Sequence, residues 1–128
     1  MVIDKLVIRL KDKKIMKGKT SNFSSYKKSF DMDLLSGKVV KVHVEKLKAA
    51  FIVHSFKGDK SYTYTYEDVI PEWGSKVKVE FIDGEVMIGY NPFDLYEEHG
   101  FFLYPADLLG NNKCVFIVNS ATKKITFI

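Results

Sequence analysis

The chain reads Leu6-Val7-Ile8-Arg9-Leu10-Lys11-Asp12, followed by Ile15-Met16-Lys17-Gly18, and it repeats this pattern once. The second occurrence is Val77-Lys78-Val79-Glu80-Phe81-Ile82-Asp83, followed by Val86-Met87-Ile88-Gly89. The turn Asp residues and the strand Gly residues lie 71 positions apart, and the same offset places Phe30 on Phe101 and Met32 on Leu103. Self-similarity of this kind predicts an internal duplication, which decides the architecture before single residues are interpreted.

Each copy begins with the pattern of a β-hairpin. Apolar and polar residues alternate over 6–11, which is the period-2 signal of a half-buried strand. Asp12-Lys13 and Asp83-Gly84 then predict tight turns that lead to second strands over about 14–20 and 85–91. The glycines of the repeated pattern lie inside these second strands, where glycine indicates a bulge, a sharp bend or close approach of another backbone.

Three further strands are expected in each copy. The third strands cover about 29–33 and 100–104, after polar loops. For the last two strands the offset becomes 74, which matches Val40, Val42, Val44, Phe51 and Val53 with Cys114, Phe116, Val118, Ile125 and Phe127. Dense turn signals before Cys114 indicate that the second copy has gained three residues there.

Five short strands with a helical turn before the fifth are typical of a small antiparallel barrel of the SH3 or Sm type. We therefore predict an all-β fold of two tandem, duplicated five-stranded barrels that pack together, because about fifty residues bury too little surface alone. The expected organisation is a basic first barrel over 1–55, a connector with a Tyr-rich strand over 56–75, and an acidic and apolar second barrel over 76–128.

Composition and charge indicate a globular protein with an uneven charge distribution. The chain has 128 residues, 46% of them hydrophobic, and a net charge of +4. Residues 1–60 carry +9 and the remainder −5, which predicts a nucleic-acid or acidic-partner face, or two halves that attract each other. The chain has no apolar run long enough to cross a membrane, no secretory signal pattern and a single cysteine, so we expect a cytoplasmic location without membrane contact.

No catalytic, cofactor or metal constellation is evident in the sequence. The three histidines lack the short spacings of a zinc site, and no Gly-rich phosphate loop opens a helix. Asp31 and Asp33 would share one face of a strand, where a solvated edge is the preferred interpretation over a metal or acid–base pair. Cys114 is expected to be a buried small hydrophobe rather than a nucleophile. We therefore expect a protein that is not an enzyme and that has no cofactor.

Three groups of residues remain as candidates for binding. A candidate aromatic platform, which could instead cover the seam between the halves, consists of Tyr62, Tyr64 and Tyr66. A candidate anion or nucleic-acid patch, with a solvated sheet edge as the alternative, consists of Lys11, Lys13, Lys14, Lys17, Lys19, Lys27 and Lys28. A candidate protein interface consists of Ile88 and Tyr90, which replace lysines of the first copy.

The chain resembles an uncharacterised bacterial domain family. The resemblance is carried by Gly100-Phe101-Phe102-Leu103-Tyr104-Pro105-Ala106-Asp107, Asn111-Asn112 and Phe116-Ile117-Val118-Asn119-Ser120-Ala121, and in the first half by Lys48-Ala49-Ala50-Phe51-Ile52-Val53. Members of that family stand alone or are fused to signalling modules such as response-regulator receiver domains. The resemblance implies a fold and supplies no catalytic residues.

Two weaker resemblances point to other ligands. Asp83-Gly84, Gly89 and Asn119 are similar to the outline of Sm-like barrels, which implies RNA binding, although the first copy departs from it at Lys13 and Glu45. Asn22-Phe23-Ser24 is similar to part of a PilZ-type cyclic-dinucleotide sensor, but the expected upstream pair of arginines is missing.

The function expected from the sequence is a non-enzymatic binding or adaptor module for protein–protein interaction in bacterial signalling, with a protein partner or a second copy of itself. The alternative is binding of RNA or single-stranded nucleic acid through the Lys-rich first copy. A cyclic-dinucleotide sensor ranks last.

Overall fold

The computed structural model describes residues 1–57, 74–92, 96–107 and 109–128. These residues form ten strands and the 3-10 turns η1 and η4, which precede β5 and β10. The elements are β1 (Ile3–Leu10), β2 (Ile15–Thr20), β3 (Ser29–Leu34), β4 (Val39–His43), η1 (Val44–Lys46), β5 (Leu47–Val53), β6 (Ser75–Phe81), β7 (Val86–Asn91), β8 (Gly100–Pro105), β9 (Asn112–Val118), η4 (Asn119–Ala121) and β10 (Thr122–Phe127). The all-β prediction is confirmed, and no helix in the described residues is long and apolar enough to span a membrane.

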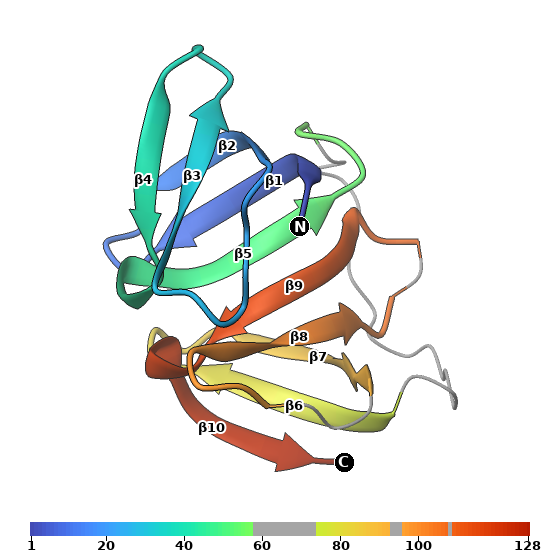
Figure 1. Ribbon diagram of the computed structural model, residues 1–128. Coiled ribbons are helices and arrows are strands. Elements are labelled where there is room, and N and C mark those ends of the chain that lie inside the picture. Colours follow the sequence, from blue (N-terminus) through green and yellow to red (C-terminus); the bar gives the residue numbers. More distant parts are fainter. Residues whose placement is uncertain (58–73, 93–95, 108) are drawn as a thin grey trace.

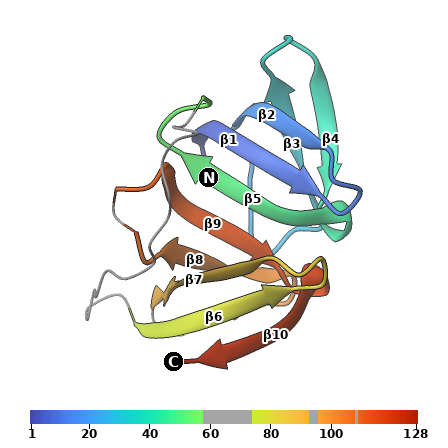
Figure 2. The same cartoon turned by 180° about the vertical axis from the view of Figure 1, so that it is seen from behind.

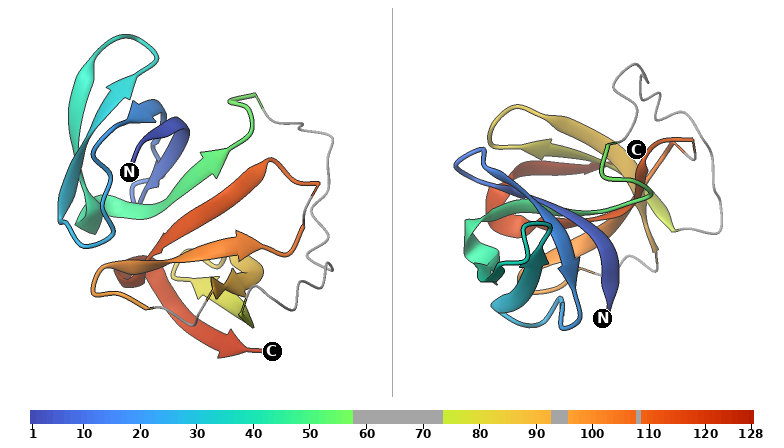
Figure 3. Two further views of the ribbon diagram at one scale, coloured as in Figure 1. Left: turned by 45° about the vertical axis from the view of Figure 1, so that its right-hand side comes forward. Right: turned by 90° about the horizontal axis from the view of Figure 1, so that it is seen from above.

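All ten strands belong to one antiparallel sheet, in the order β10-β6-β7-β8-β9-β5-β1-β2-β3-β4. The first five strands form one half and the last five the other, and the halves join where β5 pairs with β9, from Ala49↔Ile117 to Ile52↔Cys114. Figure 3 shows these two strands side by side between the halves. The sheet is open, with β10 and β4 as its edges, so the halves share one sheet, and tandem duplicated barrels remain a prediction.

The strand pairing of the two halves follows one pattern, but with a different offset from the one expected. Gly18 pairs with Leu34 and Gly89 with Pro105, which keeps the offset of 71. Phe30 pairs with Val42, whereas its counterpart Phe101 pairs with Ile117, so the offset at the fourth strand is 75. The predicted offset of 74 is therefore wrong by one residue.

The error has a physical cause. Residues 114–118 of β9 are all buried, so both faces of this strand are apolar and the sequence shows no alternation from which to read the register. A slip of one residue exchanges the two faces of a strand. The 3-10 turns confirm the corrected offset, because η1 begins at Val44 and η4 begins 75 residues later at Asn119.

Two hydrophobic cores lie on opposite faces of the β5–β9 pair. The first core contains Ala50, Phe116 and Val118 together with residues from β1, β3 and β4. The second core contains Ala49, Phe51, Val115 and Ile117 together with residues from β6, β7 and β8. Each core therefore takes side chains from both halves, which holds the seam together without a separate interface.

The glycines of β2 and β7 allow close approach of a neighbouring strand, which is one of the three possibilities expected from the sequence. A Cβ atom at Gly18 would lie 2.0 Å from the carbonyl oxygen of Asp33, and one at Gly89 would lie 2.5 Å from that of Tyr104. A side chain at either position would force the neighbouring strand away.

Candidate binding site between the two halves

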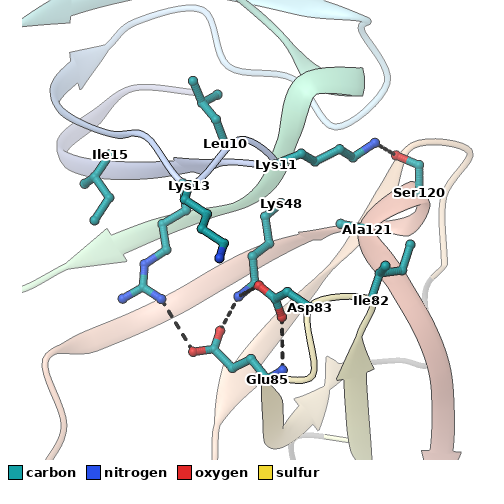
Figure 4. A pocket seen from close by; sticks show the side chains of 11 residues that line it. Leu10, Lys11, Lys13, Ile15, Lys48, Ile82, Asp83, Glu85, Ser120 and Ala121 are labelled. Atoms are coloured by element: carbon teal, nitrogen blue, oxygen red, sulfur yellow. Dashed lines mark hydrogen bonds and ion pairs between the residues drawn. The ribbon is translucent and has the colours of Figure 1, made fainter.

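The turns of the β1–β2 and β6–β7 hairpins lie at one end of the molecule together with the 3-10 turns η1 and η4 (Figure 1, Figure 2). Between them is a pocket of about 510 Å³. The residues that line it come from the β1–β2 hairpin, the start of β5, the β6–β7 turn and η4, so both halves contribute (Figure 4). They are Arg9, Leu10, Lys11, Lys13, Ile15, Lys48, Ile82, Asp83, Glu85, Ser120 and Ala121.

The two hairpin turns that face each other across this pocket share one backbone geometry. In the first turn the N–H of Lys13 donates to the carbonyl oxygen of Leu10 at 3.0 Å, and in the second the N–H of Gly84 donates to that of Phe81 at 3.0 Å. The φ angle of Lys13 is 74° and that of Gly84 is 93°, so both residues lie in the left-handed region. Glycine adopts this region freely, whereas a side chain costs about 1–2 kcal/mol.

Lys13 is the one non-glycine residue at positive φ in the described part of the chain. Its side chain is exposed, and Figure 4 shows no bond from its ammonium group to the other residues drawn. Among the described residues none forms a hydrogen bond or an ion pair with this group. The turn therefore carries a conformational cost that no contact of the Lys13 side chain offsets.

An ion-pair network crosses the seam at the floor of the pocket. The Lys48 Nζ atom lies 2.7 Å from an Asp83 carboxylate oxygen and 2.7 Å from a Glu85 carboxylate oxygen, and Arg9 lies 3.5 Å from Glu85. Lys48 is buried, and its ammonium also lies 4.6 Å from the centre of the Phe81 ring. The hydrogen bond from Lys48, together with the backbone N–H of Glu85, lowers the pKa of Asp83 below its ordinary value of 3.8.

The pocket keeps an excess of positive charge after these pairs form. Four cationic and two anionic side chains line it, which leaves a net charge of +2. Lys11 donates to the Ser120 hydroxyl at 2.6 Å, so its charge stays uncompensated, as does that of Lys13. Ile15 and Ile82 lie at the same pocket with exposed fractions of 55% and 67%. This arrangement suits an anionic group that has an apolar group beside it.

A family model matches residues 3–128, and it is described as a family of unknown function, DUF6982. The chain belongs to this family. No curated protein and no solved structure matches it. Membership in DUF6982 agrees with the expected uncharacterised domain family and assigns no activity, so the site in this DUF6982 chain is interpreted from its own residues.

Two of the seven predicted lysines of this DUF6982 chain line the pocket. Lys11 and Lys13 lie at the pocket, whereas Lys14 pairs with Asp12 at 3.8 Å and Lys17 donates to the Phe56 carbonyl oxygen at 3.1 Å. The other three lie elsewhere: Lys19 beside Asp33 in the β2–β3 pair, Lys27 in the loop before β3, and Lys28 at a second pocket with His43 and His99. Two of the seven remain as site residues.

Ile88 and Tyr90, the predicted protein interface, do not line the pocket. Tyr62, Tyr64 and Tyr66 are outside the described residues. Tyr90 is 4% exposed and packs with Ala106, and Ile88 is half-buried against them. Cys114 is buried as predicted, and burial raises the pKa of its thiol to about 11. Within the described ranges no group of three potential metal ligands gathers.

Four residues of the pocket were not predicted from the sequence as site residues: Lys48, Asp83, Glu85 and Ser120. Asp83 was interpreted only as a turn residue, and the pairing of β5 with β9 that brings the halves together has no local signal. Lys48 carried a signal that could have been used, because it stands in the otherwise apolar stretch 47–53. A lysine in such a stretch indicates a buried charge, and buried charges are paired.

Proposed function

We propose that this chain is a non-enzymatic adaptor module that binds an acidic segment of a partner protein in the pocket between its halves. The observation that carries the proposal is a pair of uncompensated lysines, Lys11 and Lys13, beside two exposed isoleucines. An Asp or Glu side chain next to Leu, Ile or Phe supplies both groups that this surface accepts. The family resemblance of the sequence supports a place in bacterial signalling, with the two halves as tandem small barrels.

The charges favour a carboxylate over a nucleic-acid backbone. Recognition of nucleic acid usually relies on the bidentate fork of arginine, and Arg9, the sole arginine, is already paired with Glu85. A nucleic acid would need several phosphate contacts in a row, whereas two of the seven predicted lysines, Lys11 and Lys13, line the pocket. Binding of RNA or single-stranded nucleic acid is therefore the competing outcome of the test.

The test is a selection of random peptides displayed on phage against the immobilised protein. We expect enrichment of sequences in which Asp or Glu adjoins Leu, Ile or Phe, and we expect the double variant Lys11→Ala/Lys13→Ala to lose it. The matched control is Lys14→Ala/Lys19→Ala, which removes the same charge outside the pocket and should retain the enrichment. Enrichment that survives in the pocket variant, or salt-sensitive binding of single-stranded RNA without any peptide enrichment, would overturn the proposal.

A further inference from the structure

We infer that Lys13 is the residue that receives the partner's carboxylate, and that its left-handed backbone conformation is retained for this contact. The inference rests on the proposed function and adds a specific residue and a specific ligand group to it.

The first argument comes from the sister hairpin. Asp12 and Asp83 each accept a hydrogen bond from the backbone N–H two residues later, at 3.0 Å in both turns. With the same turn closed in the same way, Gly84 shows that glycine satisfies the backbone at the position of Lys13. The turn itself therefore gives no reason for a lysine, and strain of this kind is typically retained at functional sites.

The second argument is that the Lys13 side chain has no structural task among the described residues. Asp83 and Glu85 already have Lys48 at 2.7 Å, and Lys13 makes the smallest contribution to the lowered pKa of Asp83. The side chain is exposed and belongs to neither hydrophobic core. A residue that costs conformational free energy and whose side chain makes no hydrogen bond or ion pair among the described residues is explained by a ligand.

The third argument is the position of the ammonium group. Lys11 is held by Ser120, and Arg9 and Lys48 are held by carboxylates, so Lys13 is the cation of the pocket without a fixed partner in the described residues. It stands at the tip of one hairpin and faces the turn of the other, with Ile15 and Ile82 at the same pocket (Figure 4). A carboxylate bound there would have apolar side chains within reach on both halves.

The test compares Lys13→Gly with the wild-type protein in two measurements. Because glycine relieves the left-handed strain, thermal unfolding should shift upward by about 3–5 °C. Fluorescence anisotropy with a C-terminally amidated peptide that repeats Gly-Glu-Leu should show at least roughly tenfold weaker binding, since a charge-assisted contact is lost. A fold that becomes more stable while binding weakens cannot owe that weakening to unfolding.

Two further variants are matched controls. Lys14→Ala removes one charge from the same hairpin and should keep the wild-type affinity. Lys13→Asn keeps a residue that tolerates the left-handed region but removes the charge, so it should weaken binding as much as Lys13→Gly. A peptide with its only carboxylate at a free C-terminus distinguishes the source of the carboxylate, and we expect the internal Glu residues to bind more tightly.

The outcomes separate the two proposals. If the wild-type protein binds the Gly-Glu-Leu peptide and Lys13→Gly binds it equally well, the inference fails while the proposed function stands. If Lys13→Gly does not raise the unfolding temperature, the strain argument is wrong. If the wild-type protein does not bind the peptide and binds single-stranded RNA instead, both proposals fail together.

Discussion

The β1–β2 and β6–β7 hairpins place different residues on one backbone design. Both turns carry an aspartate that caps the turn and a residue at positive φ, but this residue is Lys13 in the first hairpin and Gly84 in the second. The second hairpin has the residue that the backbone prefers, and its acidic groups hold Lys48 across the seam. The first hairpin has a lysine, Lys13, in the left-handed region that favours glycine, and the side chain of this lysine is exposed. The second hairpin thus contributes its carboxylates to the cohesion of the halves, whereas the proposed role of the first hairpin is to present Lys13 to a partner.

The same contrast separates the two equivalent strands β9 and β4. Strand β9 lies at the seam and is buried on both faces, whereas β4 is an edge strand with Val39, Lys41 and His43 exposed. At the corrected offset, Phe116 of β9 is the counterpart of Lys41 of β4. Lysine on an open sheet edge discourages pairing with another chain. The two halves therefore differ at their fourth strand, which is covered on both faces in the second half and lies at the open edge of the sheet in the first half.

The largest expected effect comes from truncating this pair of counterparts. Phe116→Ala should lower the free energy of unfolding by about 3–5 kcal/mol, because Phe116 is 1% exposed and contacts the Phe23 and Phe102 rings. Lys41→Ala should change it by no more than about 0.5 kcal/mol. Urea denaturation of both variants measures the difference in the free energy of unfolding. Similar losses in the two variants would show that β9 is not packed better than β4.

Replacement of the strand glycines by alanine should destabilise the two halves to a similar extent. Gly18→Ala and Gly89→Ala should each cost about 2–3 kcal/mol, because the new methyl group meets the backbone of β3 or β8. Gly37→Ala is the control, since a Cβ there meets no atom within 4 Å and only its φ of 91° opposes the change. Thermal unfolding should rank the control as the mildest, and a neutral Gly89→Ala would contradict the close approach of β7 and β8.

Removal of the seam ion pair should have an intermediate effect. Lys48→Met keeps the apolar stem but leaves Asp83 without its ion-pair partner and leaves Glu85 with Arg9 alone, at 3.5 Å. Both carboxylates are about 40% exposed, so the expected cost is reduced by solvent screening to about 1–2 kcal/mol at neutral pH.

The pH dependence of this variant provides a second measurement. The pKa of Asp83 is lowered in the folded protein, so its contribution to stability is present above its ordinary value of 3.8 and is lost as the pH falls through the folded pKa. Lys48→Met removes the main cause of the lowered pKa and should flatten the stability curve in this acidic range. An unchanged acid limb of the unfolding profile would show that the ion pair does not stabilise the fold.

The contrast between the halves also explains what the sequence could and could not predict. Alternation in β1 and β6 is clear because one face of each hairpin is polar, and the turn residues were found from their local chemistry. Strand β9 shows no alternation of apolar and polar residues, because each of its faces packs in a different core. The register predicted for it was therefore wrong by one residue. The pocket depends on the pairing of β5 with β9, which joins residues 59 to 68 positions apart in the chain. Lys48 is the local sign of this pairing in the sequence.

The smallest expected change in stability is also the most direct test of the contrast between the hairpins. The double variant Lys13→Gly/Gly84→Lys exchanges the two residues at positive φ and keeps the composition and net charge. Relief of strain in one turn, about 1 kcal/mol, should offset the strain added in the other, so the unfolding free energy should stay within about 0.5 kcal/mol of the wild type. Affinity for the Gly-Glu-Leu peptide should not recover, because a lysine at position 84 does not restore the cation at the tip of the first hairpin. The single variant Gly84→Lys completes the cycle, and we expect it to be about 1 kcal/mol less stable than the wild type with an unchanged affinity for the peptide. Recovery of binding in the double variant would show that the pocket needs a positive charge, but not at position 13.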